Sequence, residues 1–202
     1  AEITDALHSF QNMLDLEYEF VLGRKGKSVR LTVEFQKMHF FHLAGLQYLK
    51  DLPRLAFSAE LIFDQLTDGT ISADYIERHG SMDYQKSGRI ASALEEIFDS
   101  NDTIFRYNLA LQAFSVIEAD FLMKNTLDNI NLFTFLAKGK SGKYFCKSFF
   151  PDTKKDYAER QTKWTVLLKK KIRESAGSEE ILYKHPAFEY TPSQHSCSET
   201  TA

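Results

Sequence analysis

The sequence has few cysteines and no long hydrophobic run. Its two cysteines, Cys146 and Cys197, are far apart in a chain of 202 residues, which excludes a disulfide framework and a zinc site built from cysteine pairs. No apolar run approaches the roughly 18 residues of a bilayer-spanning helix, and no charged-then-apolar leader opens the chain. We therefore expect a cytoplasmic protein without a membrane segment.

The sequence also lacks the motifs of several common enzyme classes. It contains no P-loop, no dinucleotide-binding glycine fingerprint, no Gly-x-Ser-x-Gly elbow and no protein-kinase signature. Segment 139–142, Gly-Lys-Ser-Gly, is similar to a phosphate-binding loop in composition only, because its spacing is wrong. These absences exclude the nucleotide-binding and hydrolase families that are recognised by such motifs.

Material for a packed core is plentiful. Hydrophobic residues make up 43% of the chain and aromatic residues 13%, and the length suits one domain of ordinary size. Apolar spacing predicts helices at 4–15, 37–49, 55–66, 72–78 and 84–98. Alternation predicts strands at 17–22, 29–35, 103–109, 113–123, 130–137, 144–150 and 164–172.

The order of these segments indicates a fold class. A helical middle segment follows the first two strands, and most of the remaining strands come after it. This segregation predicts an α+β fold, with a mainly antiparallel sheet packed against helices. After Arg173 the composition turns to Ser, Glu, Pro and Thr. We therefore expect residues 1–175 to form a single α+β domain and residues 176–202 a polar C-terminal extension.

The charge balance differs between two parts of the chain. The net charge is −3, yet residues 137–173 hold ten Lys and two Arg against three acidic residues, a balance of +9. The rest of the chain carries −12. Clustered basic side chains attract phosphates whatever the total charge, so this asymmetry favours a polyanionic partner. The alternative is a basic strand face that acidic helices of the same fold neutralise.

Two histidines, His39 and His42, stand three residues apart in a helical segment that is apolar almost all the way round. They share one flank of the helix, with His39 nearer the polar side and His42 nearer the apolar side, so we expect His39 to face solvent and His42 the core. Such a pair can act as general base and acid, pack as hydrogen-bonded core residues, or bind metal. A metal site needs a third ligand, such as Glu34 or Asp51, and no His-Glu-x-x-His pattern is present. We expect no metal site.

Aromatic residues are interleaved with the basic ones in 137–173. Cations follow a phosphate backbone and exposed rings stack on unpaired bases, so this combination is typical of nucleic-acid binding. We expect Lys143, Lys147, Lys163 and Gln161 to contact nucleic acid.

The same aromatic residues can equally serve the core. We expect that of Phe145, Phe149 and Trp164, whereas Tyr157 and Gln161 stand in a polar run and are expected on the surface.

Arg89 follows Ser87 and Gly88 early in the expected helix 84–98. Its guanidinium can bind an anion, or it can pair with the nearby Asp83 or Glu96. Both alternatives stay open.

Segment 35–52, with its His-Phe-Phe-His-Leu-Ala-Gly-Leu core, resembles the fourth phage-associated group of nucleases related to barnase, EndoU, colicin and RelE toxins. Shorter patterns are also similar and extend the resemblance to about Arg173: Gly69–Ser72, Arg89–Leu94, Glu118–Leu122, Asn131–Leu136 and the pair Tyr157 and Gln161.

This resemblance implies an α+β fold and metal-independent RNA cleavage without a cofactor. It also implies a role in phage or host conflict, with RNA as substrate and a cognate inhibitor or antitoxin protein as partner. A non-catalytic module that binds nucleic acid or protein on the same fold is the alternative.

The resemblance also implies roles for individual residues. His39 or His42 would take the proton from a ribose 2′-hydroxyl, and the other histidine or Tyr157 would protonate the leaving oxygen. Arg89, Lys147 or Lys163 would stabilise charge in the transition state.

Overall fold

The computed structural model describes residues 2–49, 58–79, 92–100, 102–151 and 155–191. About 40% of the residues are in strands and 27% in helices. The strands are β1 (Leu16–Arg24), β2 (Lys27–Glu34), β3 (Asp102–Arg106), β4 (Phe121–Leu127), β5 (Ile130–Lys138), β6 (Tyr144–Pro151), β7 (Thr162–Arg173) and β8 (Ser178–Lys184). The helices are α1 (Glu2–Met13), α2 (Lys37–Leu43), α3 (Ala59–Thr67), α4 (Ala73–His79) and α6 (Leu94–Asp99), with 3-10 turns η1 (Leu46–Tyr48) and η2 (Leu109–Leu111).

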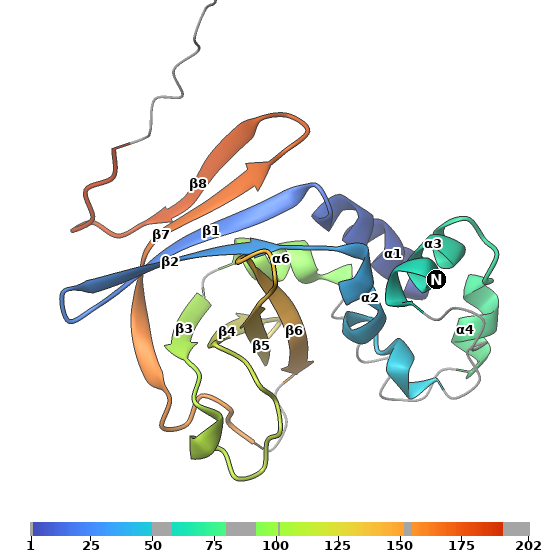
Figure 1. The fold of residues 1–202 in the computed structure, drawn as a ribbon, viewed down its shortest axis with the longest axis horizontal. Coiled ribbons are helices and arrows are strands. Elements are labelled where there is room, and N and C mark those ends of the chain that lie inside the picture. The colour runs from blue at the N-terminus through green and yellow to red at the C-terminus, as the bar shows by residue number, and fades with distance from the viewer. Residues whose placement is uncertain (1, 50–57, 80–91, 101, 152–154, 192–202) are drawn as a thin grey trace, which may run out of the picture.

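Strands β1 to β7 form a closed barrel. Neighbours follow in the order β1, β2, β6, β5, β4, β3 and β7, and β7 pairs with β1 again. β2 and β6 run parallel and are joined through one residue pair, Val33 and Tyr144. The other neighbours in the ring are antiparallel. β8 lies outside the ring on β7, and β1 has a partner along both edges (Figure 1).

The expectation of a sheet packed against helices is therefore wrong. Strands are present at 17–22, 29–35, 130–137, 144–150 and 164–172, with boundaries that differ by a few residues. β1 pairs with β7 and places Phe20 opposite Lys169. The apolar pattern within either strand does not indicate this pairing. This long-range pairing turns the sheet on itself, and a closed sheet buries its inner face without a covering layer of helices.

The barrel wall is apolar on both faces along β3 to β5. Leu132 and Leu136 of β5 belong to the main core inside the barrel, whereas Phe133 and Phe135 belong to a second cluster on the outside. The second cluster is covered by the segments that precede β4 and β7, through residues such as Tyr107 and Tyr157. Because both faces are buried, β5 reads as a nearly continuous apolar run.

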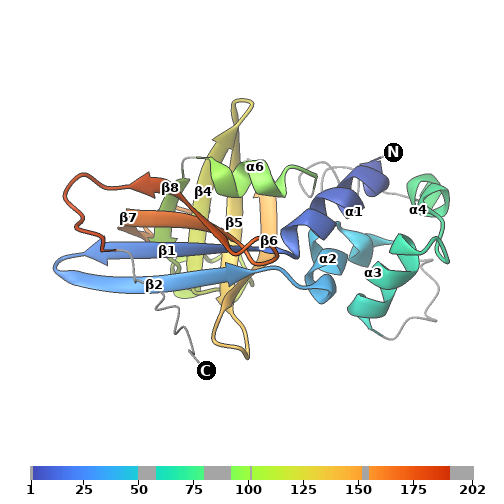
Figure 2. The ribbon, with the colours of Figure 1, turned by 90° about the horizontal axis from the view of Figure 1, so that it is seen from above.

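The helices α1 to α4 gather beside one end of the barrel (Figures 1 and 2). Phe10 of α1 joins them, since its ring lies 5.3 Å from the ring of Phe40 in α2 and 5.8 Å from that of Phe63 in α3. α6 contacts α1 and buries Leu94, Ile97 and Phe98 in the main core. Among the described residues, no helix has the length and apolar character needed to cross a bilayer.

The helix that carries the histidines is shorter than expected. It ends at Leu43, because Gly45 adopts a left-handed conformation with φ of 73°, and η1 follows. Glycine takes this conformation without a steric cost, so it ends helices commonly. The predicted single helix over 37–49 is wrong, and the chain turns where the sequence places its only glycine in that segment.

Two other segments differ from the sequence pattern. Residues 113–120 form no strand but run over the outer cluster, where the hydroxyl groups of Tyr107 and Ser115 lie 3.1 Å apart, and β4 begins at Phe121. Residues Ser178–Lys184, predicted as part of a polar extension, form β8 and pair with β7. The apolar residues of this segment are too few to predict a strand, because β8 is an edge strand with mostly exposed side chains.

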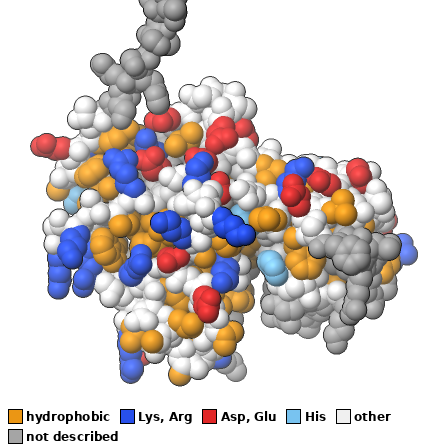
Figure 3. All heavy atoms as spheres, in the orientation of Figure 1, with side chains coloured by type: hydrophobic (Ala, Val, Ile, Leu, Met, Phe, Trp, Pro, Cys, Tyr) orange, Lys and Arg blue, Asp and Glu red, His pale blue; other side chains and the backbone are white. Residues whose placement is uncertain are grey.

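Much of the basic charge on β7 is neutralised within the fold. Lys169 pairs with Asp102 at 2.9 Å, and both side chains are only 3% exposed. Lys171 pairs with Glu95 and Asp99, both in α6, each at 2.8 Å. Lys170 and Arg173 also contact carboxylates. The face of the molecule in Figure 3 accordingly shows basic side chains scattered among acidic and hydrophobic ones.

The buried pair of Lys169 and Asp102 yields a test of the fold. Lys169→Met leaves the Asp102 carboxyl buried without its partner, and burial already raises the pKa of Asp102. We expect a loss of about 3–5 kcal/mol in the free energy of unfolding, measured with urea. Lys169→Met/Asp102→Leu should recover most of that loss, because no buried charge remains.

The exposed pair of Arg30 and Glu19 is the matched control, and Arg30→Ala should change stability by less than about 1 kcal/mol. Equal effects of Lys169→Met and Arg30→Ala would show that the buried pair does not hold α6 and β3 on β7.

Candidate active site

The side chain of His39 lies between α2 and the barrel. Its imidazole stacks on the ring of Phe145 in β6, with ring centroids 4.5 Å apart and planes inclined by 9°. The residue is half-buried. Phe145 belongs to neither apolar cluster, so the ring expected in the core instead forms a platform for the histidine.

The hydrogen bonding of His39 fixes its tautomer. Its Nδ1 accepts a hydrogen bond of 3.2 Å from the backbone N–H of Gln36, so the proton of the neutral ring sits on Nε2. Burial, with a smaller contribution from His42, lowers the pKa of His39 from the usual 6.5 to about 4. At neutral pH, His39 is therefore an uncharged hydrogen-bond donor.

His42 is exposed, the reverse of what the helical projection predicts. Phe40 and Leu43 of α2 face the core, and the helix also packs on β6. This second contact covers the flank of His39 and leaves His42 open to solvent, with its ring 5.3 Å from that of Phe41. The expectation that His39 faces solvent and His42 the core is wrong.

A polar network surrounds the start of β6 beside these histidines. Glu34 accepts hydrogen bonds from the Ser141 hydroxyl at 2.9 Å and from the Gln36 side-chain amide at 3.1 Å. Lys143 is paired with Glu17 of β1. Lys143 is therefore partly occupied by a carboxylate, and the loop before β6 is tied to the end of β2.

Tyr157 lies far from the histidines. Its ring stacks on Phe150 with centroids 5.8 Å apart, and Phe150 stands five positions after Phe145 in β6. At about 3.3 Å per residue, these platforms are roughly 16 Å apart along the strand. Burial raises the pKa of Tyr157, and its ring also contacts Phe133 and Phe135. Tyr157 and His39 therefore do not meet at one reacting phosphate.

The remaining predicted site residues are dispersed. Lys147 is the unpaired residue of a β-bulge in β6, between Cys146 and Ser148. Lys163 is exposed on β7, on another side of the barrel. Arg89 lies outside the described residues.

Gln161 is buried rather than exposed. Its amide oxygen accepts from the backbone N–H of Asn108 at 2.7 Å, and its amide nitrogen donates to the Asn108 carbonyl at 3.1 Å. The residue is 8% exposed, so the expectation of a surface position is wrong. Both ends of its side chain are used to fix the segment before β4 against the segment before β7.

Sequence reasoning missed two contributors to the histidine site. The backbone N–H of Gln36 fixes the tautomer of His39, and the signal was its place three residues before His39 at a helix start, the spacing of a capping box. The stacking of Phe145 left no signal in the sequence, because it depends on how α2 packs on β6.

No cluster of three or more His, Cys, Asp or Glu side chains that could hold a metal ion occurs within the described ranges. The histidine site offers two imidazoles, a neutral donor in His39 and an exposed ring in His42.

The comparisons place the chain beside one family. A family model described as phage-Barnase-EndoU-ColicinE5/D-RelE like nuclease4 matches residues 2–185, which includes α1 to β8. Neither the curated proteins nor the solved structures contain a match.

The lowered pKa of His39 predicts how stability depends on pH. The unfolded chain takes up the proton near pH 6.5 and the folded chain only near pH 4, so the free energy of unfolding should decrease as the pH falls between these values. His39→Phe keeps a stacked ring that does not titrate and should remove this part of the decrease. Urea unfolding at several pH values measures it.

The control is His8→Asn, which replaces an exposed histidine of α1 and should keep the decrease that His39 causes. A His39→Phe profile identical to the wild type would mean that His39 titrates normally in the folded protein.

Proposed function

Because the chain belongs to this phage-associated family of nuclease-like proteins, we propose that it is a metal-independent endoribonuclease whose reacting groups are the histidines of α2. A nuclease-type domain follows from the family. The choice of RNA, a toxin role in the cytoplasm and control by a cognate inhibitor protein are the finer parts of the proposal.

The contrast between the two imidazoles carries this proposal. His39 is held neutral, and its Nε2–H has no hydrogen-bond acceptor among the described residues, whereas His42 stands in solvent one helical turn away. Neighbouring titratable groups whose environments differ in this way commonly divide the tasks of an acid–base reaction. Two core histidines packed for stability alone would not leave one ring exposed.

The geometry supports a division of roles. His42 takes the proton of the ribose 2′-hydroxyl while that oxygen forms a bond to the adjacent phosphorus. The Nε2–H of His39 donates a hydrogen bond to a non-bridging phosphate oxygen, where negative charge grows.

The bond from phosphorus to the 5′-oxygen then breaks, and this oxygen receives the proton that His42 had taken. The products are a 2′,3′-cyclic phosphate and a 5′-hydroxyl. His39 does not serve as the acid, because the loss of the only ring proton from a neutral imidazole is too unfavourable. The distance of Tyr157 likewise favours a role in binding.

Lysines near the start of β6 are suited to holding the RNA backbone. Lys140 is exposed in the loop before β6, and Lys147 stands at the bulge two residues after Phe145. The lysines of β7 are less suited, since Lys169, Lys170 and Lys171 already contact carboxylates.

The first test is cleavage of single-stranded RNA by the purified protein in EDTA. We expect 2′,3′-cyclic phosphate ends, and we expect His42→Ala to reduce the rate by about 10²–10⁴-fold, the usual contribution of a general base. His39→Ala should also reduce the rate, and the product ends should be analysed by mass spectrometry.

His8→Ala removes an exposed histidine from α1 and should leave the rate unchanged. RNA binding without cleavage across varied substrates would favour the non-catalytic module instead. Cleavage that survives His39→Ala/His42→Ala in a folded protein would place the chemistry elsewhere.

The second test is the salt dependence of RNA affinity. Binding should weaken as salt rises, with a slope of about −0.7 in log K against log salt for each phosphate contact to single-stranded RNA. Lys140→Ala and Lys147→Ala should each make the slope shallower by about that amount, as measured by fluorescence anisotropy at several salt concentrations.

Lys27→Ala, at the exposed start of β2, is the control that should leave the slope unchanged. Affinity that does not depend on salt would rule out a backbone contact through these lysines.

A further inference from the structure

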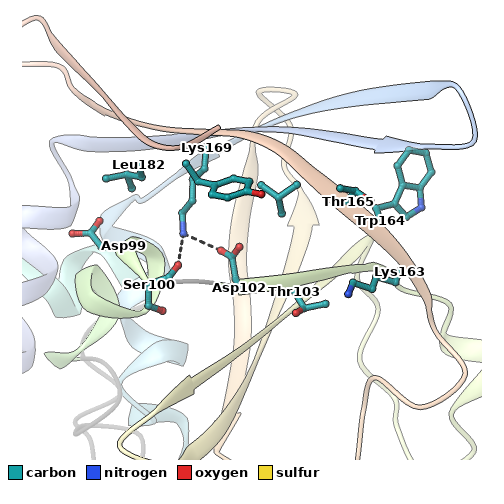
Figure 4. Close-up of a pocket in the computed structure, with 11 residues that line it drawn as sticks. Asp99, Ser100, Asp102, Thr103, Lys163, Trp164, Thr165, Lys169 and Leu182 are labelled. Atoms are coloured by element: carbon teal, nitrogen blue, oxygen red, sulfur yellow. Dashed lines mark hydrogen bonds and ion pairs between the residues drawn. The ribbon is translucent and has the colours of Figure 1, made fainter. Parts of the chain in front are cut away.

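A pocket of about 400 Å³ opens where β7 changes its neighbour. β7 pairs with β3 over residues 162–164 and with β8 over residues 168–173. Between these stretches the edge of β7 faces the pocket, which lies between the start of β3 and the end of β8 (Figure 4). In the order of the ring, this position is several strands away from β6 and its histidine helix on either side.

The floor of the pocket is polar and fixed in place. Lys169 donates hydrogen bonds to the Asp102 carboxylate at 2.9 Å and to the Ser100 carbonyl at 2.8 Å (Figure 4). The side chains of Lys169 and Asp102 are each 3% exposed. A buried ion pair with these bonds gives a ligand a preformed polar surface that needs no rearrangement.

The walls combine apolar and hydroxyl groups. Val166 and Leu182 line the pocket, together with the ring of Tyr183, a residue that is 39% exposed. Thr103 of β3 and Thr165 of β7 contribute hydroxyl groups. Such a lining suits a flat, amphipathic ring that stacks on an aromatic side chain and forms hydrogen bonds at its edge.

Among the described residues that line the pocket, the ion pairs leave one cation for a ligand. Asp99 accepts a hydrogen bond of 2.6 Å from the Tyr18 hydroxyl and pairs with Lys171, and Asp102 is paired with Lys169. Lys163 is exposed at the rim and, among the ion pairs of the described residues, takes part in none. An anionic group of the ligand would therefore sit at Lys163, outside the apolar walls.

We propose that this pocket binds a nucleotide, with the base inside against Tyr183 and the phosphate at Lys163. The volume lies within the range of small-molecule sites, about 300–1,000 Å³. The ring and the hydroxyl groups match a nucleobase, and the exposed Lys163 matches one phosphate. The site is separate from the histidine pair and does not depend on RNA cleavage. The ligand is either a free mononucleotide or the end of an RNA strand.

The chain contains its own reporter of binding. Trp164, the only tryptophan of the sequence, lines the pocket. Mononucleotides should change its fluorescence saturably, nucleosides should bind at least about tenfold more weakly, and inorganic phosphate alone should have no saturable effect. A nucleoside lacks the phosphate that contacts Lys163, and inorganic phosphate lacks the base that stacks on Tyr183.

Variants assign the two contacts. Lys163→Ala should weaken mononucleotide binding by about tenfold or more and leave nucleoside binding unchanged. Tyr183→Ala should weaken both. Lys184→Ala removes the exposed cation next to Tyr183 and is the matched control, which should bind as the wild type does. Urea unfolding midpoints confirm that each variant is folded.

The two sources of ligand are separated with a short oligonucleotide and the His42→Ala protein, which should cleave it too slowly to affect the binding measurement. Tighter binding of the oligonucleotide than of the mononucleotide identifies a strand end, and equal or weaker binding identifies a free mononucleotide. No fluorescence change with any nucleotide, or a change that neither Lys163→Ala nor Tyr183→Ala alters, overturns the proposal. His42→Ala should bind mononucleotides as the wild type does. If the protein does not cleave RNA, this binding test is therefore still valid.

Discussion

The pairing of β1 along both of its edges is the constraint on which the structure depends. β1 pairs with β2 over residues 17–24 and with β7 over residues 16–23. Without the second pairing the sheet would stay open, and the inner faces of β3 to β7 would need a layer of helices to cover them. Closure also places the lysines of β7 beside the carboxylates of α6 and β3. The fold class, the position of the pocket and the charge balance all follow from it.

Local patterns predicted local structure well. The alternation of Val29, Leu31 and Val33 marked β2, and apolar spacing marked α1. Closure was not predictable, because the partners of β1 in β7 are about 150 positions away and no local pattern encodes that choice. β8 was not predicted for a different reason. An edge strand with exposed side chains lacks the apolar alternation of a half-buried strand.

The histidine site shows the same division. The residues of α2 and the capping position of Gln36 could be read from the sequence. The exposure of each ring could not, because a helix with two packing partners has two buried flanks, and the projection accounts for one. The positive charge of residues 137–173 also overstated the basic surface. The carboxylates that pair with Lys169 and Lys171 lie in elements distant in the sequence. Charge summed along a chain predicts a surface potential only when the charges reach the surface.

The single residue pair between β2 and β6 gives the barrel a seam with few backbone hydrogen bonds. α2 follows β2 directly and packs on β6, so side-chain contacts across the seam replace part of the missing ladder. The stack of His39 on Phe145 is one of these contacts. Regions with few backbone hydrogen bonds are the ones that open at the lowest free energy, and amide hydrogen exchange reports such opening. Protonation of His39 and opening of the seam are therefore coupled. Acid should open the barrel first at β6, the strand that carries Phe145.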